Sequence, residues 1–324
     1  MMVRAATVLE PMNVESRPAP HIPVLADRVI ELLAPAPGQV IVDCTVGAGG
    51  HSLAILPRLL PSTADGGTTP GRVLAIDRDA EALASARDRL IEFTPQVEFI
   101  HDNFSRLPEL LTRAGVTRVH GIVADLGLSS LHVDRAERGF SFLREGPLDM
   151  RMDQREPRTA ASLLQEVSEA ELARILEVYG EERFARRIAQ RLVTARRMEP
   201  IRTTTQLARV VAAAVPRPES RRHGRGFHPA TRTFQALRIA VNHELADLEA
   251  LLNALPAVLQ PGGRAVIIAF HSLEDRPVKR AFQQGAKDGV FRLLTKKPLV
   301  PSDQEIAQNP RSRSAKLRAV ERLA

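Results

Sequence analysis

The stretch of sequence that decides the fold is VDCTVGAGGHS, residues 42–52. An apolar, β-branched run ends at Asp43, and Gly47, Gly49 and Gly50 follow before a helix-forming segment. Glycine lets the backbone turn sharply and approach a ligand closely, and the first N–H groups of the next helix can bind that ligand. The stretch predicts a strand, a ligand-binding turn and a helix, although a simple tight turn gives the same pattern.

Outward from this turn, short apolar runs alternate with segments of helix-forming residues. Such runs are typical of strands that are buried on both faces of a parallel sheet. The alternation predicts an α/β fold with a doubly wound, Rossmann-like sheet. The expected strands are QVIVD (39–43), RVLAID (72–77), VEFIHDNF (97–104), VHGIVADLG (119–127) and AVIIAF (265–270).

Acidic side chains follow the carboxyl ends of the expected strands. Asp43, Asp77 and Asp125 end three of them, and Asp102 lies in the segment that ends a fourth. Ligands of open α/β sheets bind at this edge. Asp77, at the end of the second strand, is placed to accept both hydroxyl groups of an adenosine ribose, or alternatively to cap the next helix.

The spacing of these residues separates two classes of cofactor. A dinucleotide-binding fingerprint has the form G-x-G-x-x-G, with an acid about 20 residues further on. Here Gly50 comes too early for the third glycine, and Asp77 lies too late for the acid. The pattern favours a methyltransferase over a nicotinamide-dependent oxidoreductase. Phe104 fits the apolar slot that adenine needs, and a core position explains it nearly as well.

The span between the fourth and fifth expected strands is too long for one crossover helix and carries helical signals. Ser168 with Glu171, and Thr203 with Gln206, form capping-box patterns before apolar segments of helical period. We therefore predict an inserted helical domain for substrate recognition at residues 131–215.

The remaining segments are assigned around this insertion. Residues 21–130 and 216–324 are expected to form one discontinuous methyltransferase domain, and the Pro-rich residues 1–20 a flexible tail. One long helix is expected in the second part of that domain. Its apolar stripe consists of Phe234, Leu237, Val241, Leu245, Leu248 and Leu252.

The chain is cationic. Its 324 residues include 45 lysines and arginines against 38 acidic residues, a formal net charge of +7. Such a surface binds the phosphates of nucleic acid, although coding bias also produces arginine-rich chains. No run of 18 apolar residues is present, and Cys44 is the only cysteine. These features predict a cytoplasmic protein with a nucleic-acid partner, without a membrane span, disulfide or cysteine metal site.

Longer motifs carry a resemblance to a known family. They are HIPVLADRVIELL (21–33), VDCTVGAGGHS (42–52), AIDRDAEAL (75–83), DLGLSS (125–130), RGFSFLREGPLDMRMD (138–153), YGEERFARRIAQ (179–190), HPATRTFQALRIAVNHEL (228–245), PGGRAVIIAFHSLEDRPVKR (261–280) and NPRSRSAKLRAVER (309–322). From His21 onward the sequence closely resembles the bacterial small-subunit ribosomal RNA cytosine-N4 methyltransferases, called the RsmH or MraW family.

This resemblance implies a class I methyltransferase sheet with an inserted helical substrate domain, and S-adenosyl-L-methionine as the cofactor. It implies N4-methylation of a cytosine in the decoding centre of 16S rRNA, within the small ribosomal subunit, and no stable protein partner. Carried over motif by motif, the cofactor-binding residues are Gly49, Gly50, His51, Asp77 for ribose, Phe104 for adenine and Asp125 near the methionine end. Residue 132 is a further family position, usually Gln, where this chain has His132.

Asp125 is also the candidate catalytic residue. The exocyclic amine of cytosine is a poor nucleophile, because its lone pair is delocalised into the ring, and it must give up a proton. We expect Asp125 or a nearby backbone carbonyl to accept a hydrogen bond from this amine; alternatively, Asp125 only orients the cofactor. His271, after the fifth strand, is either a second candidate acceptor or a structural histidine. The scattered histidines and acids predict no metal site.

Three cationic segments are candidates for the RNA surface. They are the repeat Arg183, Arg187 and Arg191, the segment RRHGRG at 221–226, and RSRSAKLR at 311–318, which we favour because Arg and Ser both donate to phosphate. Two other functions stay open: a methyltransferase for a different RNA, DNA or protein, and a non-catalytic RNA-binding or ribosome-assembly factor. The intact glycine turn speaks against the second, since a pure binder needs no cofactor pocket.

Overall fold

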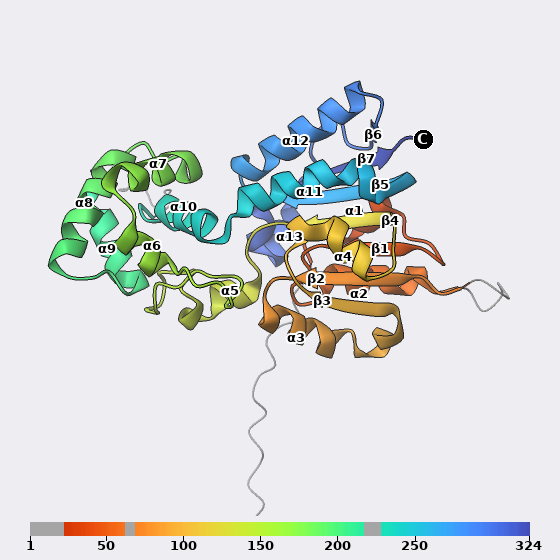
Figure 1. Ribbon diagram of the computed structural model, residues 1–324, viewed down its shortest axis with the longest axis horizontal. Coiled ribbons are helices and arrows are strands. Elements are labelled where there is room, and N and C mark those ends of the chain that lie inside the picture. The colour runs from red at the N-terminus through yellow and green to blue at the C-terminus, as the bar shows by residue number, and fades with distance from the viewer. Residues whose placement is uncertain (1–22, 62–68, 217–227) are drawn as a thin grey trace, which may run out of the picture.

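The structure is a computed structural model that describes residues 23–61, 69–216 and 228–324. It consists of an α/β unit, built on a sheet, and a helical unit beside it (Figure 1). The expected tail at 1–20 and the cationic segment 221–226 lie outside the described residues. Within the described ranges, no helix is long and apolar enough to cross a membrane.

The sheet of the α/β unit has the strand order β3-β2-β1-β4-β5-β7-β6. Strands β1 to β5 are parallel to their neighbours in this set, whereas β7 pairs antiparallel with β5 and β6. The order reverses between β1 and β4, which is where doubly wound sheets bind ligands. The expected α/β fold is therefore confirmed. The strands are β1 (Val40–Asp43), β2 (Arg72–Asp77), β3 (Val97–His101), β4 (Val119–Asp125), β5 (Leu259–Ala269), β6 (Phe291–Leu293) and β7 (Lys316–Arg322).

Helices cover both faces of this sheet. Successive side chains of a strand point to opposite faces, so that Ile41 of β1 packs with one layer of helices and Val42 with the other. The first layer contains α1 (Ala26–Leu33), α2 (Gly50–Leu59) and α3 (Ala80–Arg89). The second contains α4 (Leu107–Arg113), α11 (Glu244–Val258) and α12 (Ser272–Lys287).

Short helices complete the connections. They are α5 (Ser130–Asp134), α13 (Asp303–Gln308) and the 3₁₀ helices η1 (Ile91–Gln96), η2 (Phe104–Arg106), η3 (Ala136–Arg138) and η5 (Pro310–Ser314). Of these, α5 and η3 follow β4 and lead the chain from the sheet towards the helical unit (Figure 1).

The helical unit has its own hydrophobic core. The predicted cap Ser168 accepts from the backbone N–H of Glu171, and Thr203 forms a capping box with Gln206. The domain boundaries at 131 and 215 stay a prediction, but α10 adds its apolar side to this core beyond the second boundary. The helices are α6 (Ala160–Glu166), α7 (Glu169–Gly180), α8 (Ala185–Met198), α9 (Thr204–Ala214) and α10 (Thr231–Asn242).

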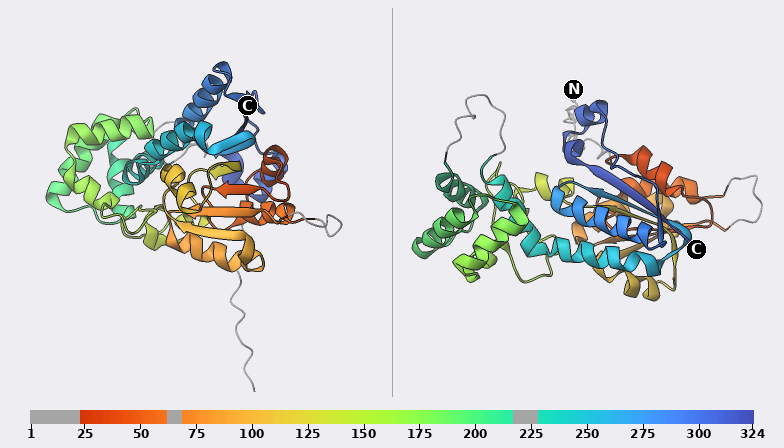
Figure 2. Two further views of the ribbon diagram at one scale, coloured as in Figure 1. Left: turned by 45° about the vertical axis from the view of Figure 1, so that its right-hand side comes forward. Right: turned by 90° about the horizontal axis from the view of Figure 1, so that it is seen from above.

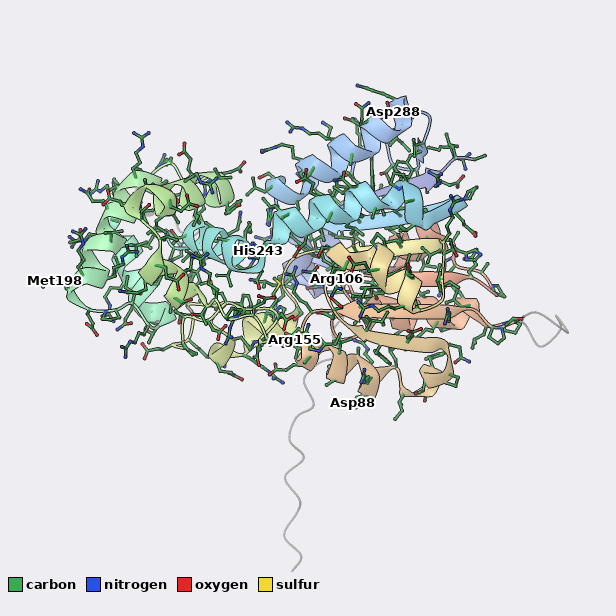
Figure 3. All side chains as sticks on the ribbon, viewed as in Figure 1. Asp88, Arg106, Arg155, Met198, His243 and Asp288 are labelled. Atoms are coloured by element: carbon green, nitrogen blue, oxygen red, sulfur yellow. The ribbon has the colours of Figure 1, made fainter. Side chains whose placement is uncertain are left out.

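The long helix that the sequence predicts is two helices, α10 and α11. They are separated by His243, whose backbone is left-handed with φ 54°. The carbonyl of Asn242 accepts a hydrogen bond from Arg78 Nη1 at 2.7 Å. An external donor thus takes the place of a helical partner, and α10 ends there. His243 and Arg155 lie between the two units, Met198 at the outer end of the helical unit and Asp288 at the end of α12 (Figure 3). The views in Figure 2 also keep the two units side by side.

The C-terminal strands β6 and β7 were not predicted. Leu317 and Ala319 of β7 are fully buried, with Arg318 between them 7% exposed. The Arg318 guanidinium is bonded to Asp275, with an Nε–Oδ1 distance of 2.6 Å. The prediction that segment 311–318 offers its cations to RNA is therefore wrong for Arg318, because a strand of the sheet uses this residue in an internal ion pair.

Candidate active site

The glycine turn after β1 requires glycine at defined positions. Gly47 and Gly49 have φ values of 52° and 80°, in the left-handed region that disfavours side chains. The backbone N–H of Gly49 donates to Val46 O at 2.7 Å, and α2 begins at Gly50. The N–H of Gly47 donates to Asp77 Oδ2 at 2.9 Å. The turn is thereby tied to the end of β2.

A cavity lies beside this turn, at the carboxyl ends of β1, β2 and β4. Of the predicted residues, Gly50, His51, Asp77 and Asp125 line it. The cavity therefore coincides with the switch point of the sheet, as expected for a ligand of this fold. Among the described residues, no group of three or more His, Cys, Asp or Glu side chains is placed to hold a metal ion.

Asp125 and His51 form a pair in the cavity wall. His51 Nε2 lies 3.4 Å from Asp125 Oδ2, and the backbone N–H of Asp125 donates to Thr45 Oγ1 at 2.7 Å. The other polar atom of each side chain, His51 Nδ1 and Asp125 Oδ1, is buried without a hydrogen-bond partner in the described part of the chain. Buried polar atoms are normally paired, so the pair is arranged for a polar ligand.

Burial and charge together set the ionisation of this wall. Burial lowers the pKa of His51, but the hydrogen bond to Asp125 and the charges of Asp125 and Asp43 outweigh it, and the pKa is raised. Burial raises the pKa of Asp43 to about 6, although His51 and a hydrogen bond from Ser52 Oγ at 2.7 Å oppose this shift. His51 in the wall therefore keeps its proton to a higher pH than a free imidazole, and Asp43 behind it has a pKa of about 6.

Asp77 is held rigidly at the end of β2. Its two oxygens accept from the backbone N–H of Gly47 and of Asp79, each at 2.9 Å. Burial is the largest influence on its pKa, which is raised. A carboxylate has about four acceptor positions, so Asp77 can still bind the hydroxyl groups of a ligand in the cavity.

Comparison with known proteins identifies the family of this chain. The model of the MraW methylase family matches residues 18–323. The chain belongs to this family. Its predicted resemblance is therefore confirmed, and the protein is a methyltransferase.

Curated relatives and a solved structure are similar to this chain. Proteins named ribosomal RNA small subunit methyltransferase H are 46% identical over 320 residues in Acidothermus cellulolyticus and 48% identical over 315 residues in Nostoc punctiforme. The matches cover 94% and 97% of both chains, respectively. The structure of an rRNA methylase from Streptococcus thermophilus is 14% identical, with a TM-score of 0.39 and coverage of 92% of this chain and 94% of that one.

Three of the predicted cofactor residues lie outside the cavity lining. Gly49 packs against α3, where an added Cβ would lie 3.3 Å from Leu90. Phe104 is 6% exposed and lines a second, smaller cavity, which shares Thr45 and Leu126 with the first. His132 is 4% exposed and contacts another carboxylate. Their contacts with a cofactor stay predictions.

The alternative acceptor His271 is half-buried beside Arg238. Its Nε2 lies 3.3 Å from Arg238 Nη2, and it does not line the cavity. Burial and the Arg238 charge lower the pKa of His271 to about 3. The ring is therefore neutral near pH 7 and is a poor acceptor for a substrate proton.

Sequence reasoning missed several residues of the cavity wall. Thr45 and Phe270 follow the ends of β1 and β5, so the rule that identified the acids could have found them. Pro23 and Arg311 come from opposite ends of the chain. No local signal identifies these two, because only the folded sheet brings them to the cavity.

Proposed function

We propose that this protein transfers the methyl group of S-adenosyl-L-methionine to the N4 amine of a cytosine in the decoding centre of 16S rRNA. The observation that carries the proposal is the match of nearly the whole chain to curated relatives named ribosomal RNA small subunit methyltransferase H. A match of 94–97% of each chain includes both the sheet and the helical unit, and so supports the same class of substrate.

The cavity fits this cofactor. Asp77 offers a fixed carboxylate for the two ribose hydroxyl groups, and Phe104 lines the adjoining space for adenine. Asp125 Oδ1, buried and unpartnered in the described chain, is an acceptor for the ammonium group or for the substrate amine. When bound, S-adenosylmethionine supplies an electrophilic methyl group on its sulfonium.

The chain's own part in the reaction is to orient the amine and take its proton. Asp125 Oδ1 accepts a hydrogen bond from the cytosine amine, which turns the nitrogen lone pair towards the methyl group. His51 lies behind Oδ2 of the same carboxylate, at 3.4 Å. As the nitrogen–carbon bond forms and the carbon–sulfur bond breaks, the amine proton passes to the Asp125–His51 pair.

The outer face of α8 is the RNA surface that the structure favours. Arg187 and Arg191 are exposed on α8, and Arg183 is exposed just before this helix begins. Within the described chain, none of the three forms an ion pair with a carboxylate; Arg183 only lies over the ring of Phe184, at 4.6 Å. Cations without internal partners are available for phosphates.

The first experiment is transfer of a tritiated methyl group to small ribosomal subunits that lack the cytosine mark, with mass spectrometry of the nucleosides. We expect N4-methylcytosine at one site. Transfer to another RNA, to DNA or to protein in a parallel panel would overturn the proposed substrate. Absence of transfer from a protein that still binds S-adenosylhomocysteine would do the same.

Asp125→Ala tests the proposed role of this carboxylate. We expect the transfer rate to fall at least about 100-fold, the usual scale for loss of a general base. Calorimetry with S-adenosylhomocysteine then separates the two roles of Asp125, since loss of affinity alone would mean that it only orients the cofactor. Asp88→Ala, at an exposed aspartate of α3, is the matched control and should keep normal turnover.

A further inference from the structure

The loop after β2 connects the cavity to the helical unit. Asp77 accepts from the backbone N–H of Gly47 in the glycine turn and from that of Asp79. The residue between them, Arg78, donates to the carbonyl of Asn242, the last residue of α10. The three consecutive residues therefore make three different contacts. Asp77 contacts the cavity wall, Arg78 contacts the end of α10, and Asp79 belongs to a buried ion pair.

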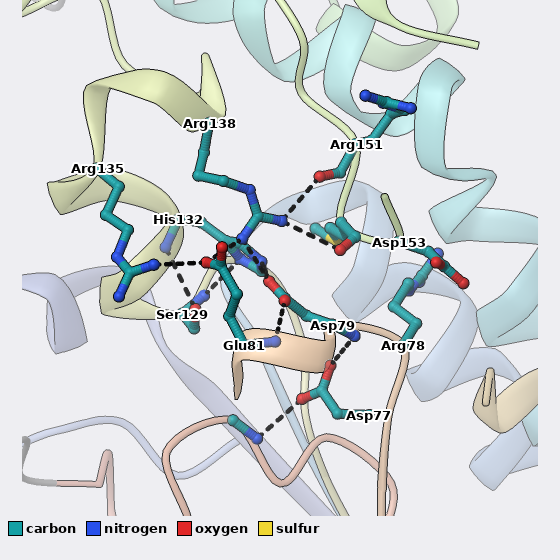
Figure 4. A network of polar contacts seen from close by, with 12 residues as sticks. Asp77, Arg78, Asp79, Glu81, Ser129, His132, Arg135, Arg138, Arg151 and Asp153 are labelled. Carbon is teal, nitrogen blue, oxygen red and sulfur yellow. Dashed lines mark hydrogen bonds and ion pairs between the residues drawn. The ribbon is translucent and has the colours of Figure 1, made fainter. Parts of the chain in front are cut away.

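Asp79 is the buried centre of this junction (Figure 4). Its carboxylate is 2% exposed, and Oδ2 lies 2.7 Å from His132 Nε2 and 2.8 Å from Arg138 Nη1. Burial raises the pKa of Asp79, but the two partners outweigh it and lower the pKa to about 2. His132 Nδ1 accepts from the N–H of Ser129, so Nε2 carries the proton that bonds Asp79. The carboxylate is ionised and fixed from two sides.

Arg138 extends these contacts into the helical unit. Its Nη2 donates to the carbonyls of Arg151 and Met152, at 3.0 and 3.1 Å. The Asn242 side chain binds the same segment: Oδ1 accepts from Met152 N and Nδ2 donates to Met150 O, each at 2.7 Å. Met150 and Met152 belong to the hydrophobic core of the helical unit. Polar contacts therefore run without a gap from the cavity wall to that core.

Two features distinguish this junction from an ordinary salt bridge between units. Arg138 Nη1 donates to the carboxylates of Asp79 and Glu81, and Nη2 donates to backbone carbonyls, a combination that only the guanidinium fork allows. In addition, Asp79 contacts Asp77 through its own backbone N–H, so a shift of the ion pair moves the proposed ribose ligand directly.

We propose that Arg138 is a positioning residue, which couples cofactor binding at Asp77 to RNA binding by the helical unit. This inference rests on the proposed function. A cofactor in the cavity fixes loop 77–79 and, through Arg138, segment 150–152; RNA on the helical unit fixes the same segment. Because the first ligand to bind already orders segment 150–152, the second ligand binds with a smaller loss of conformational entropy.

Thermodynamic linkage makes this proposal measurable. The factor by which small subunits raise the affinity for S-adenosylhomocysteine must equal the factor by which S-adenosylhomocysteine raises the affinity for subunits. We expect a factor of roughly 5 or more, the lower end of typical allosteric coupling. Equilibrium dialysis with labelled S-adenosylhomocysteine gives the first factor, and filter binding of subunits that lack the mark gives the second.

The deciding variant is Arg138→Lys. Lysine keeps the charge opposite Asp79 but cannot also reach both carbonyls with a second nitrogen. We expect the variant to bind S-adenosylhomocysteine alone within a few-fold of the wild type, while the coupling factor falls to about 1. Arg135→Gln is the control, because Arg135 shares Glu81 with Arg138 but forms no ion pair with Asp79 in the described structure. It should keep the full factor.

Each outcome decides the proposal. A factor of 1 in the wild type, or a full factor in Arg138→Lys, overturns it. Methyl transfer to subunits without coupling overturns this inference alone, whereas subunits that neither bind nor accept methyl groups overturn the proposed substrate as well. If Arg138→Lys does not fold, Arg78→Lys tests the same coupling at the contact with Asn242, and an unchanged factor there contradicts the proposal.

Discussion

Two carboxylates act on one imidazole in the cavity wall. The charges of Asp125 and Asp43 both favour the protonated form of His51, and together with the Asp125 hydrogen bond they outweigh the opposing effect of burial on its pKa. A protonated His51 stabilises the Asp125 carboxylate and makes it a weaker acceptor for the amine proton. Turnover should therefore require neutral His51, and the pH at which activity appears should follow the pKa of this histidine.

Asp43→Asn tests this dependence at the residue scale. The variant removes one of the charges that raise the pKa of His51, so this pKa must fall. We expect the acid limb of kcat/KM for methyl transfer to move to lower pH, because His51 then loses its proton at lower pH. The measurement is kcat/KM against pH with subunits that lack the mark.

The matched control for this variant is Asp88→Asn, which removes an exposed charge from α3. Its acid limb should coincide with that of the wild type. An acid limb of Asp43→Asn that stays in place, or that moves to higher pH, contradicts the role of His51 in taking the proton.

At the residue scale, the sequence predicted the acidic residues of the site better than the residues that surround them. Asp77 and Asp125 were found because strand ends are visible in the sequence and parallel strands end at one edge. Arg311 could not be found, because only the fold brings the C-terminal segment to the cavity. His132 was carried over with a motif, and its position against Asp79 depends on the turn after β4, which the sequence does not specify.

At the scale of elements, the first turn of α12 contains an unusual carboxylate. Glu274 is 2% exposed, and its Oε2 accepts from the backbone N–H of Phe270 at 2.8 Å. Burial raises the pKa of Glu274 to about 7, against the opposing charge of Arg238. The folded state thus binds a proton that the unfolded chain releases at lower pH, and its stability falls as pH rises from about 4.5 to about 7.

Glu274→Gln should remove this loss of stability at higher pH, because glutamine keeps an acceptor oxygen and cannot ionise. The shift in the pKa of Glu274 corresponds to about 3 kcal/mol in the free energy of unfolding. We expect the variant to exceed the wild type in free energy of unfolding by up to that amount at pH 8, and to match it below about pH 4. Urea unfolding across this range provides the measurement; a constant difference at every pH contradicts the prediction.

The exposed arginines of the α8 surface predict how binding of ribosomal subunits depends on salt concentration. Replacing Arg183, Arg187 and Arg191 by Gln removes three exposed cations with no carboxylate partner in the described structure. Each phosphate contact contributes roughly 0.7–0.9 to the slope of log K against log salt. We expect weaker binding of subunits and a slope lower by about 2–3, measured by filter binding at several salt concentrations.

The control for the α8 variant removes the same charge elsewhere. Lys279, Arg280 and Lys287 are exposed on α12 of the α/β unit. Their replacement by Gln should leave the slope close to that of the wild type. Equal losses in both triple variants would show that net charge, and not the α8 surface, accounts for the binding.

The elements themselves were predicted where the pattern is local. The expected strand 72–77 is β2 to the residue, because its apolar run lies between turn signals. Strand β7 was missed, because its arginines were assigned to RNA and the antiparallel pairing with β5 depends on distant residues. The break at His243 was also missed, since the donor that ends α10 is Arg78, about 160 residues earlier in the chain.

At the scale of the whole molecule, a small polar junction joins the helical unit, with its own hydrophobic core, to the α/β unit, where a hydrophobic cluster lies on each face of the sheet. The sequence predicted an inserted helical region, because its length and caps are visible, but not the junction, which draws on residues from 78 to 242. A second polar contact also joins the units: Glu181, at the end of α7, accepts from Ser272 and Arg276 of α12. The junction is the contact that begins at the cavity wall, so a ligand in the cavity should change the motion of the helical unit through it.

Hydrogen exchange tests this last point without RNA. The amide of Met150 donates to Arg138 O at 3.1 Å, and the amide of Met152 donates to Asn242 Oδ1, so both report opening of the junction. We expect S-adenosylhomocysteine to slow exchange at these amides in the wild type and in Arg135→Gln. In Arg138→Lys the slowing should stop at the glycine turn and loop 77–79. Equal slowing at 150–152 in all three proteins would mean that the units communicate by another route.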